Sequence, residues 1–472
     1  MSTTVEEGVA VGTDPAAVRR LQRRTLGVLA ATQVIGGAGI ALGIAVGALL
    51  ATRMSGPGYA GLTQSALVVG TALFAIPITR LMTRRGRRPG LSLAYLVGAL
   101  GAVLVLAAAA WRSVPLLLVG LFLFGAGSTA NLQSRYAAVD LAEPSRRGRQ
   151  LSFVFWATAL GSIGGPNLAP IVDDLLQRRG LVEYSGPFLA SAVVYVLAAV
   201  VVFVALRPDP LLTARALDNA RSARAVDPPM AADPSPAADP PVLTDTPVVD
   251  QPAAVRVAAP EKSATADGRR TKSRGLRAAA HEVAASPAAR LGLAAMAVGH
   301  LVMISVMTMT PVHIEQEGHP DTLRIVGLVI SVHIAGMYAL SPIVGWLTDR
   351  VGRRGVILGG IGLLIAACVV AGLSGHHTGG LTVGLGLLGM GWSATMVSGS
   401  TLLTESVGLA NRASAQGLAD LVTGLGGATA GALAGLVVAL SSYATLTVVA
   451  GVATIPLLAA VLRPTAVALR AG

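Results

Sequence analysis

The sequence is short of the residues that mark disulfide-bonded, zinc-binding or soluble proteins. It holds one cysteine, Cys368, so neither a disulfide framework nor a zinc cluster is expected from it. Charged residues make up only 13% of its 472 residues, whereas hydrophobic residues make up 53%. Soluble globular proteins of this size do not have that balance. We therefore expect a membrane protein, and we interpret Cys368 as a packing residue.

Long apolar segments run through almost the whole chain. A helix needs about 20 apolar residues to cross a bilayer. Twelve segments meet this requirement: 26–51, 59–79, 91–111, 115–137, 151–172, 187–206, 291–314, 325–347, 355–374, 379–403, 414–438 and 444–462. The pattern predicts an all-α membrane protein of twelve transmembrane helices, with both termini on one side.

The formal charge of +12 is unevenly distributed along the chain. Of the 36 Lys and Arg residues, 31 lie in the two tails, in the even-numbered loops or, for Arg135, at the end of the fourth segment next to such a loop. The other five lie in odd-numbered loops: Arg53, Arg112, Arg178, Arg179 and Arg324. This positive-inside bias predicts a multi-pass protein of the cell membrane with both termini in the cytoplasm. Anionic lipid then accounts for the basic charge, and no nucleic-acid partner is expected.

A change of composition divides the chain into two halves. Residues 208–289 are rich in Ala, Pro, Asp and Ser, and such a segment cannot bury enough apolar surface to offset its ordering entropy. We expect a cytoplasmic tail over 1–25, six-helix bundles over 26–207 and 290–463, a disordered cytoplasmic linker over 208–289, and a second tail over 464–472. The basic end of the linker, "GRRTKSRGLRAAAHEV", could alternatively form an amphipathic helix on the inner leaflet.

The two halves repeat each other weakly. Aligning Gly86 with Gly352, in the loops after the second and eighth segments, gives an offset of 266. Asp140 and Glu405, after the fourth and tenth segments, each precede an arginine by seven residues, and their offset is 265. Two features that agree on the offset indicate parallel structural repeats, as found in secondary transporters.

The loop "GWLTDRVGRR", from Gly345 to Arg354, resembles the signature loop of the major facilitator superfamily. The layout of six helices, a long cytoplasmic loop and six helices is similar to that superfamily along the whole chain. The resemblance implies the major facilitator fold, with two pseudo-symmetric six-helix bundles that work by alternating access. The first half departs from the signature because Thr83 stands where the aspartate is expected.

The residues of this loop suit a conformational switch. Asp349 can lie at the positive end of a helix dipole, while arginines contact carboxylates or headgroups in one conformation only. The alternative is that the arginines only follow the positive-inside rule. The candidate gating residues are Gly345, Asp349, Arg350, Gly352, Arg353 and Arg354.

A second stretch, "GSIGGPNLAP", is similar to the glycine-proline motif of the fifth helix in exchangers of the superfamily. Gly161 and Gly165 allow close helix approach, and Pro166 weakens or kinks the helix. The motif ends in Ala169 and Pro170 instead of two glycines, which weakens the case for exchange. Packing alone explains these residues equally well.

Soft metal-ligand side chains form stripes on two consecutive segments. Met303 and Met307 share a face of the seventh segment, and His333 and Met337 share a face of the eighth. At about 1.5 Å per residue, the two pairs lie at matching depths. If the faces oppose each other, three thioethers and an imidazole converge, which is a donor set for Cu(I) and not for Mg²⁺ or Ca²⁺.

These motifs, "MISVM" and "HIAGM", resemble those of the CcoA-like branch of the superfamily, which implies copper import. Met296 and His300 continue the first stripe toward the cytoplasm and could be further stops on the path. The alternatives are methionine as a gap-filler and histidine as a proton relay or core residue.

Few ionisable groups lie within the segments, so each is a candidate for coupling. Asp420 of the eleventh segment is the most deeply placed acid and is the candidate proton site; the alternative is a structural hydrogen bond. Asn131, Gln133 and Arg135 of the fourth segment are candidate substrate contacts, and Arg135 could instead pair with Asp140. We expect Asp140 and Glu405 to form structural ion pairs beside Arg147 and Arg412.

Two functions follow from these residues. The first is a secondary transporter that takes up copper through the Met/His site, driven by the proton motive force. The second is proton-coupled efflux or exchange of drugs or small metabolites, with the methionines as an adaptable wall. We expect no permanently bound cofactor and a monomer. No nucleotide-binding loop or nucleophile-base pair occurs, so we do not expect an enzyme.

Overall fold

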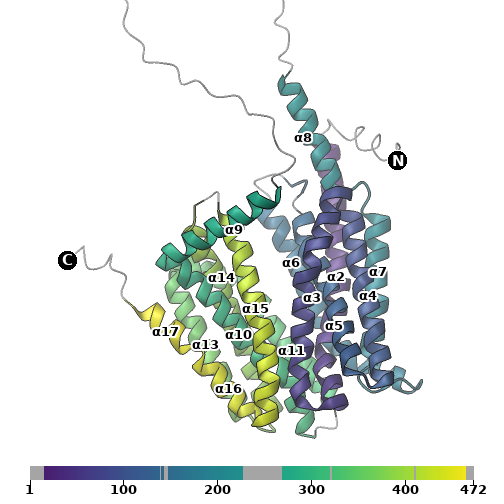
Figure 1. The fold of residues 1–472 in the computed structure, drawn as a ribbon, viewed down its shortest axis with the longest axis vertical. Helices are drawn as coiled ribbons and strands as arrows, with labels where there is room; N and C mark the ends of the chain where they lie inside the picture. Colours follow the sequence, from purple (N-terminus) through teal and green to yellow (C-terminus); the bar gives the residue numbers. More distant parts are fainter. Residues whose placement is uncertain are drawn as a thin grey trace, which may run out of the picture.

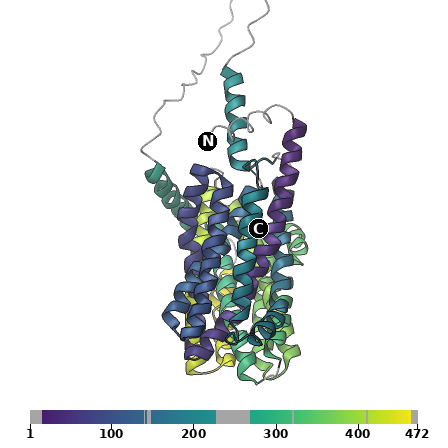
Figure 2. The same cartoon turned by 90° about the vertical axis from the view of Figure 1, so that its right-hand side faces the viewer.

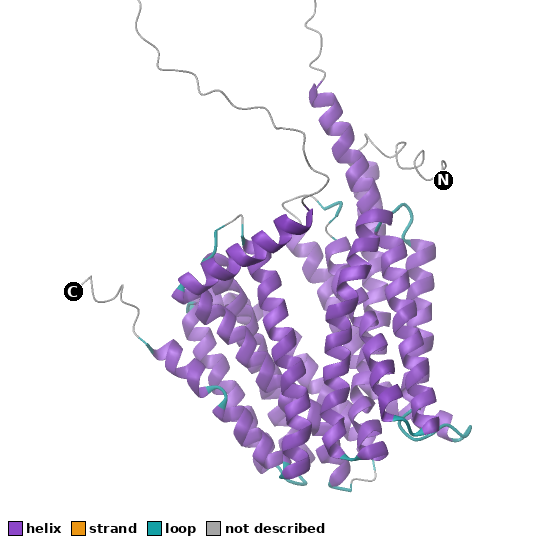
Figure 3. Ribbon diagram, viewed as in Figure 1, coloured by secondary structure: helices purple, strands orange, loops and turns teal. Residues whose placement is uncertain are grey.

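The structure is a computed structural model that describes residues 15–138, 140–142, 147–226, 268–318, 321–408 and 411–463. All regular elements in these residues are helices (Figure 3). Eleven of the helical stretches are long and apolar enough to cross a membrane, and α6, the 31-residue helix Arg147–Gln177, occupies the place of the fifth expected segment. The twelve expected transmembrane segments are therefore all helical.

The first bundle consists of six long helices (Figure 1). They are α2 (Pro15–Ser55), α3 (Pro57–Arg85), α4 (Arg87–Trp111), α5 (Val114–Ala137), α6 and α7 (Gly186–Ala205). An aromatic cluster fills its centre, where the Phe124 ring lies 5.1 Å from that of Tyr195 and 5.8 Å from that of Phe188. Only glycine fits at position 43, because the Phe124 ring occupies the space that a Cβ would need.

The second bundle also has six membrane segments, but two of them are broken. Its helices are α10 (Pro287–Gln316), α11 (Thr322–Tyr338), α12 (Ser341–Arg350), α13 (Arg353–Leu373), α14 (Thr378–Glu405), α15 (Arg412–Leu440), α16 (Tyr443–Val452) and α17 (Ile455–Leu462). Segments 325–347 and 444–462 were each expected to be one helix. Each first part ends four residues before a proline, Pro342 or Pro456, whose ring clashes with the carbonyl of that residue.

The segment expected to be a disordered linker contains two helices. These are α8 (Pro210–Val226) and α9 (Gly268–Ala285), while residues 227–267 lie outside the described residues. The Asp209 carboxylate caps α8 by accepting from the backbone N–H groups of Leu211 and Leu212 at 3.0 and 3.2 Å. Figures 1 and 2 show α8 projecting away from the first bundle, whereas α9 lies across the ends of the second.

The position of α9 is fixed by an apolar face and one carboxylate. Ala279 and Val283 are buried against Met296 of α10 and Ala419 of α15. The Glu282 carboxylate accepts from the backbone N–H of Gly408 at 2.5 Å and from the Asn411 amide at 2.8 Å, both in the loop between α14 and α15. The described part of this segment is helical, and its apolar face packs on the second bundle and not on the inner leaflet that the amphipathic alternative proposed.

The bundles contact each other on the side opposite to the beginning of α2, at Pro15, and the end of α17, at Leu462. Ser65 on α3 donates to the carbonyl of Ala428 on α15 at 2.5 Å, and Ser331 on α11 donates to that of Ile163 on α6 at 2.8 Å. Gly61 lets α3 approach the α15 backbone, because a Cβ there would overlap the carbonyl of Gly431. Figure 1 shows α3 and α15 together at this end and apart at the other. We call the two sides the contact side and the terminal side.

We predict that Glu282→Gln loosens α9. The hydrogen bonds from Gly408 and Asn411 lower the pKa of Glu282, so the ionised carboxylate stabilises docking above the usual glutamate pKa. That contribution is lost as the pH falls through the lowered pKa. Hydrogen exchange at neutral pH should become faster in α9 and in the loop after α14. Asp218→Asn, an exposed substitution on α8, is the matched control. Equal exchange in both variants would contradict the prediction.

Candidate functional site

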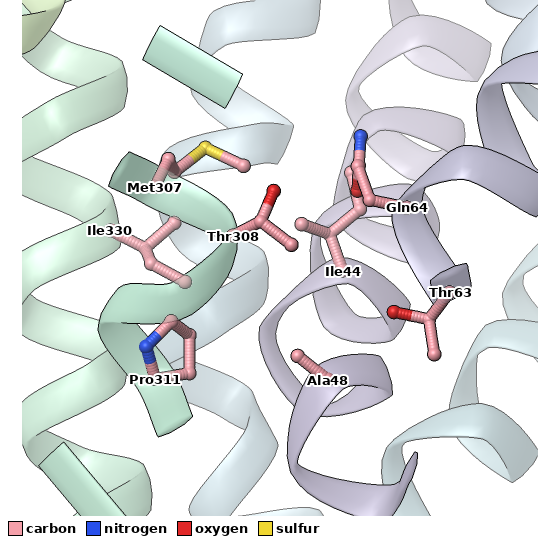
Figure 4. Close-up of a pocket in the computed structure, with 8 residues that line it drawn as sticks. All are labelled: Ile44, Ala48, Thr63, Gln64, Met307, Thr308, Pro311 and Ile330. Carbon is pink, nitrogen blue, oxygen red and sulfur yellow. The ribbon is translucent and has the colours of Figure 1, made fainter. Parts of the chain in front are cut away.

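The four proposed copper ligands do not share one environment. Met303, His333 and Met337 are buried in the core, with exposed fractions of 4%, 0% and 9%. Met307 is only partly buried and faces the first bundle. It lines a small space with Thr308, Pro311 and Ile330 on one side and Ile44, Ala48, Thr63 and Gln64 on the other (Figure 4). This space holds about one water molecule.

Helix α14 packs against both helices that carry the soft ligands, and it gives a common measure of depth. A Cβ on Gly299 of α10 would contact Thr395, and a Cβ on Gly389 would contact the backbone of His333 and Met337. At about 1.5 Å per residue, Met303 lies about 6 Å beyond Gly299. Met303 is therefore near the depth of Met337, as the sequence spacing predicts.

The His333 ring points toward α14. Its Nδ1 lies 2.9 Å from the Leu385 carbonyl oxygen, which can only accept, so Nδ1 carries the proton and Nε2 has a lone pair. Nε2 is buried and has no hydrogen-bond partner among the residues that the structure describes. Within the same residues, no group of three or more His, Cys, Asp or Glu side chains is placed to hold a metal ion.

His300 belongs to an aromatic group that the sequence did not reveal. Trp392 of α14 donates from Nε1 to His300 Nδ1 at 3.2 Å. The rings of Trp392 and Tyr338 of α11 pack edge to face, with centroids 6.1 Å apart. Gly427 of α15 lies against the other edge of His300, where a Cβ would be 3.0 Å from Nε2. Trp392 is one of only four tryptophans, which is the signal that could have identified it.

Two opposite charges face this group from different bundles. Arg135 of α5 and Asp420 of α15 lie within electrostatic range of each other, and Arg135 is also within range of the Tyr338 hydroxyl. The Asp420 side chain is exposed. Arg135, Tyr338, His300, Trp392 and Asp420 therefore form a group of polar and aromatic side chains between the bundles, which we call the central group.

The neighbours of Arg135 on α5 are occupied by structural bonds. Asn131 is buried, and its Oδ1 accepts from the Tyr95 hydroxyl at 2.9 Å. The Gln133 amide donates to Thr79 Oγ1 of α3 at 3.2 Å. Of the three candidate substrate contacts, the structure brings Arg135 to the central group and uses the other two to hold α5 against its neighbours.

Asp140 and Glu405 form ion pairs, with Arg87 and Arg353 as the partners among the described side chains. Asp140 binds Arg87 through both carboxylate oxygens at 2.8 and 3.0 Å. Glu405 binds Arg353 in the same way at 2.7 and 3.0 Å. The expected partner Arg412 instead donates to the Val407 carbonyl at 3.3 Å, and the Arg147 side chain lies outside the described residues. The pairs are equivalent in the two halves and join the third helix of each half to the fourth.

The charged residues of the candidate gating loop contact other parts of the second bundle. Asp349 lies 3.4 Å from Arg353, which also binds Glu405. Arg350 lies over the Trp346 ring at 5.2 Å, and Arg354 donates to the Arg463 carbonyl at 3.3 Å. Gly352 has a φ of 93° and Gly86 a φ of 95°, a conformation that glycine adopts without strain. This explains the repeated glycine. Gly345 is in α12, where a side chain would meet open space.

The fifth-helix motif packs α6 closely against α2. A Cβ on Gly161 would overlap the Val34 carbonyl, and one on Gly165 would lie 2.7 Å from the Ala38 carbonyl. Pro166 lies inside a continuous α6, and its carbonyl lies against Gly327 of α11. The motif therefore contacts both a neighbour in its own bundle and the other bundle.

A charged cluster joins the bundles on the contact side. Arg53 at the end of α2 binds Glu183 of its own bundle at 2.9 Å and Glu315 of α10 at 2.6 Å. The Tyr184 hydroxyl also donates to Glu315, at 3.2 Å, and Arg53 lies over the Tyr184 ring. We call these four residues the outer latch.

Comparisons with known proteins agree with this architecture. The family model of the Major Facilitator Superfamily matches residues 26–325 and 293–471. The chain is 36% identical over 440 residues to the uncharacterized MFS-type transporter YdeG of Bacillus subtilis (strain 168), covering 93% of this chain and 91% of that protein. It is 25% identical over 401 residues to the riboflavin transporter RfnT of Brucella anthropi, covering 85% of each.

A solved structure has the same fold. A mutant of the nucleoside transporter NupG superposes with a TM-score of 0.66 at 12% identity, over 93% of this chain and 99% of that one. The twelve helical membrane segments in two bundles, the repeated loops and the family match over most of the chain lead to one conclusion. The chain belongs to the major facilitator superfamily and is a membrane transporter.

Proposed function

We propose that this transporter moves a small planar aromatic solute of the flavin class by alternating access, with the central group as its binding site. The observation that carries this proposal is that the two bundles present aromatic, cationic and anionic side chains to one place. Trp392 and Tyr338 offer ring faces and edges for stacking, while Arg135 and His300 offer hydrogen-bond donors. The similarity to a riboflavin transporter supports this class of solute.

The contacts between the bundles support an inward-facing state. The outer latch and the Ser65 and Ser331 hydrogen bonds hold the contact side together. The positive-inside distribution of Lys and Arg supports a cytoplasmic terminal side, with the protein in the cell membrane. Release of the outer latch and closure of the terminal side would then expose the central group to the other face of the membrane.

Coupling to the proton motive force is proposed to pass through Asp420. Its carboxylate lies within electrostatic range of Arg135 of the other bundle. Protonation removes the attraction between them, so the equilibrium between the two orientations of the bundles would depend on proton binding. A solute that binds Arg135 would compete with the Asp420 carboxylate for the same guanidinium group. Solute binding and proton binding would therefore be coupled.

Copper uptake is the second candidate function, and one observation favours it. The His333 ring is oriented by the Leu385 carbonyl and keeps a buried Nε2 lone pair that finds no partner within the described part of the chain, the arrangement of a metal-ligating histidine with an outer hydrogen bond. Met303, Met307 and Met337 would supply thioethers as ligands for Cu(I). In this candidate Met296 and His300 form the path toward the terminal side.

We predict that Glu315→Gln weakens the outer latch and shifts the protein toward the outward-facing state. The shift in population ratio should be about two- to fivefold, because solvent screens the half-exposed Arg53. The distance between spin labels on Ser55→Cys and Ser441→Cys measures the shift. Glu183 also binds Arg53 but belongs to the same bundle, so Glu183→Gln is the control. Identical distance distributions in both variants would refute the latch.

We predict that the protein binds riboflavin and that Trp392→Ala weakens binding by about fivefold, because a stacked ring contributes about 1 kcal/mol. Quenching of riboflavin fluorescence on the purified protein measures the dissociation constant. Trp346→Ala, on α12 beside Arg350, should leave it unchanged. Absence of saturable binding to the unmodified protein, or an equal loss in both variants, would overturn the flavin assignment.

The copper candidate predicts that Met307→Leu and His333→Gln each reduce cellular copper accumulation to the level of cells without the protein. Leucine has a similar volume to methionine but no sulfur ligand, so the core should tolerate the first change. Met309→Leu, fully buried on the same helix, is the matched control. Copper accumulation that does not differ between the variants and the unmodified protein would eliminate this candidate.

A further inference from the structure

Two arginines lie side by side on the outer edge of the first bundle. The Arg88 guanidinium carbon lies 4.1 Å from the centre of the Phe203 ring, and that of Arg207 lies 5.8 Å from the same centre. Arg88 Nε also donates to the Phe203 carbonyl at 2.6 Å. The two cations lie close enough to repel each other. An exposed aromatic ring therefore holds two like charges at the terminal-side ends of α4 and α7.

The neighbouring acid does not neutralise both cations. Asp209 faces Arg88, but its carboxylate accepts three backbone N–H groups: Arg88 at 2.7 Å, Leu211 at 3.0 Å and Leu212 at 3.2 Å. The Arg207 side chain is exposed, and its charged group contacts the Phe203 ring. The cluster thus carries a net positive charge that an anion can bind.

Apolar surface continues from this cluster toward the contact side. Ser92 of α4 donates to the Ala199 carbonyl of α7 at 3.2 Å, so the two helices are adjacent. Leu93, Leu96 and Leu100 of α4 are 45–53% exposed, and Val200 and Val204 of α7 are 50% and 61% exposed. At about 1.5 Å per residue, the leucines extend from about 7 to 18 Å beyond Arg88. A cationic end and an apolar strip of this length match a headgroup and an acyl chain.

We propose that Arg88, Arg207 and Phe203 form a binding site for an acidic phospholipid of the inner leaflet. The phosphate lies between the two guanidinium groups, which bind phosphate oxygens through several N–H donors. One acyl chain lies along the exposed strip of α4 and α7. The site is on the outer edge of the first bundle and the central group is between the bundles, so the lipid is a structural ligand and not the transported solute.

The test measures the unfolding temperature of the full-length protein in phosphatidylcholine nanodiscs with and without phosphatidylglycerol. Phosphatidylglycerol should raise the unfolding temperature of the unmodified protein. Arg207→Gln should reduce this rise by about half, because it removes one of two cations near the headgroup. Arg85→Gln, an exposed change at the end of α3, is the matched control and should keep the full rise.

Three further measurements keep the proposal open to refutation. Arg207→Lys should restore most of the rise, since the charge returns. Phe203→Leu should reduce the rise as Arg207→Gln does, and it replaces that variant if the latter does not fold. An equal rise from soluble glycerol phosphate in phosphatidylcholine nanodiscs would show a site for free anions and overturn the lipid assignment. Equal responses of Arg207→Gln and Arg85→Gln would also overturn it.

Discussion

The fold depends on one constraint, that backbone N–H and C=O groups inside a bilayer must bind each other. Helices satisfy this constraint within one segment, and all regular elements of the described residues are helices. The constraint also explains where the exceptions lie. Pro342 and Pro456 interrupt their segments four residues after Tyr338 and Val452, whereas Pro166 stays inside α6. A membrane helix tolerates proline where neighbouring groups donate hydrogen bonds to the freed carbonyl or the local backbone adjusts.

The ion pairs near the ends of the membrane segments divide into pairs within one bundle and a pair between the bundles. Arg87–Asp140 and Arg353–Glu405 each lie within one bundle, and they keep that bundle a single body. The Arg53–Glu315 pair crosses between bundles and lies at their surface of contact. In the proposed alternating access, the bonds within bundles would remain and the bonds between bundles would break. This division of contacts is what alternating access requires.

The stripe of soft residues on α10 shows how packing separates residues that the sequence places together. Met296 packs with α9, His300 bonds Trp392, Met303 is buried and Met307 faces the first bundle. The side chains of residues three or four apart on a helix point in directions that differ by up to about 60° around the helix axis. Around α10, that angle is enough for neighbouring residues to meet different helices. The flavin proposal uses His300 of this stripe, whereas the copper candidate uses Met303 and Met307 as ligands and Met296 and His300 as a path.

The sequence by itself determined the number of membrane segments, the two-fold repeat and the family, because each depends on composition and spacing along the chain. It also predicted that Met303 and Met337 lie at similar depth, since the helical rise is constant. Only the tertiary structure decided which helices are neighbours. It assigned Arg87 to Asp140, turned the His333 ring toward Leu385, brought Trp392 to His300, and covered the apolar face of α9 with the second bundle. Helical periodicity fixes the direction and depth of a side chain. The partner it meets depends on the lateral order of helices, which is set by packing between segments far apart in the sequence.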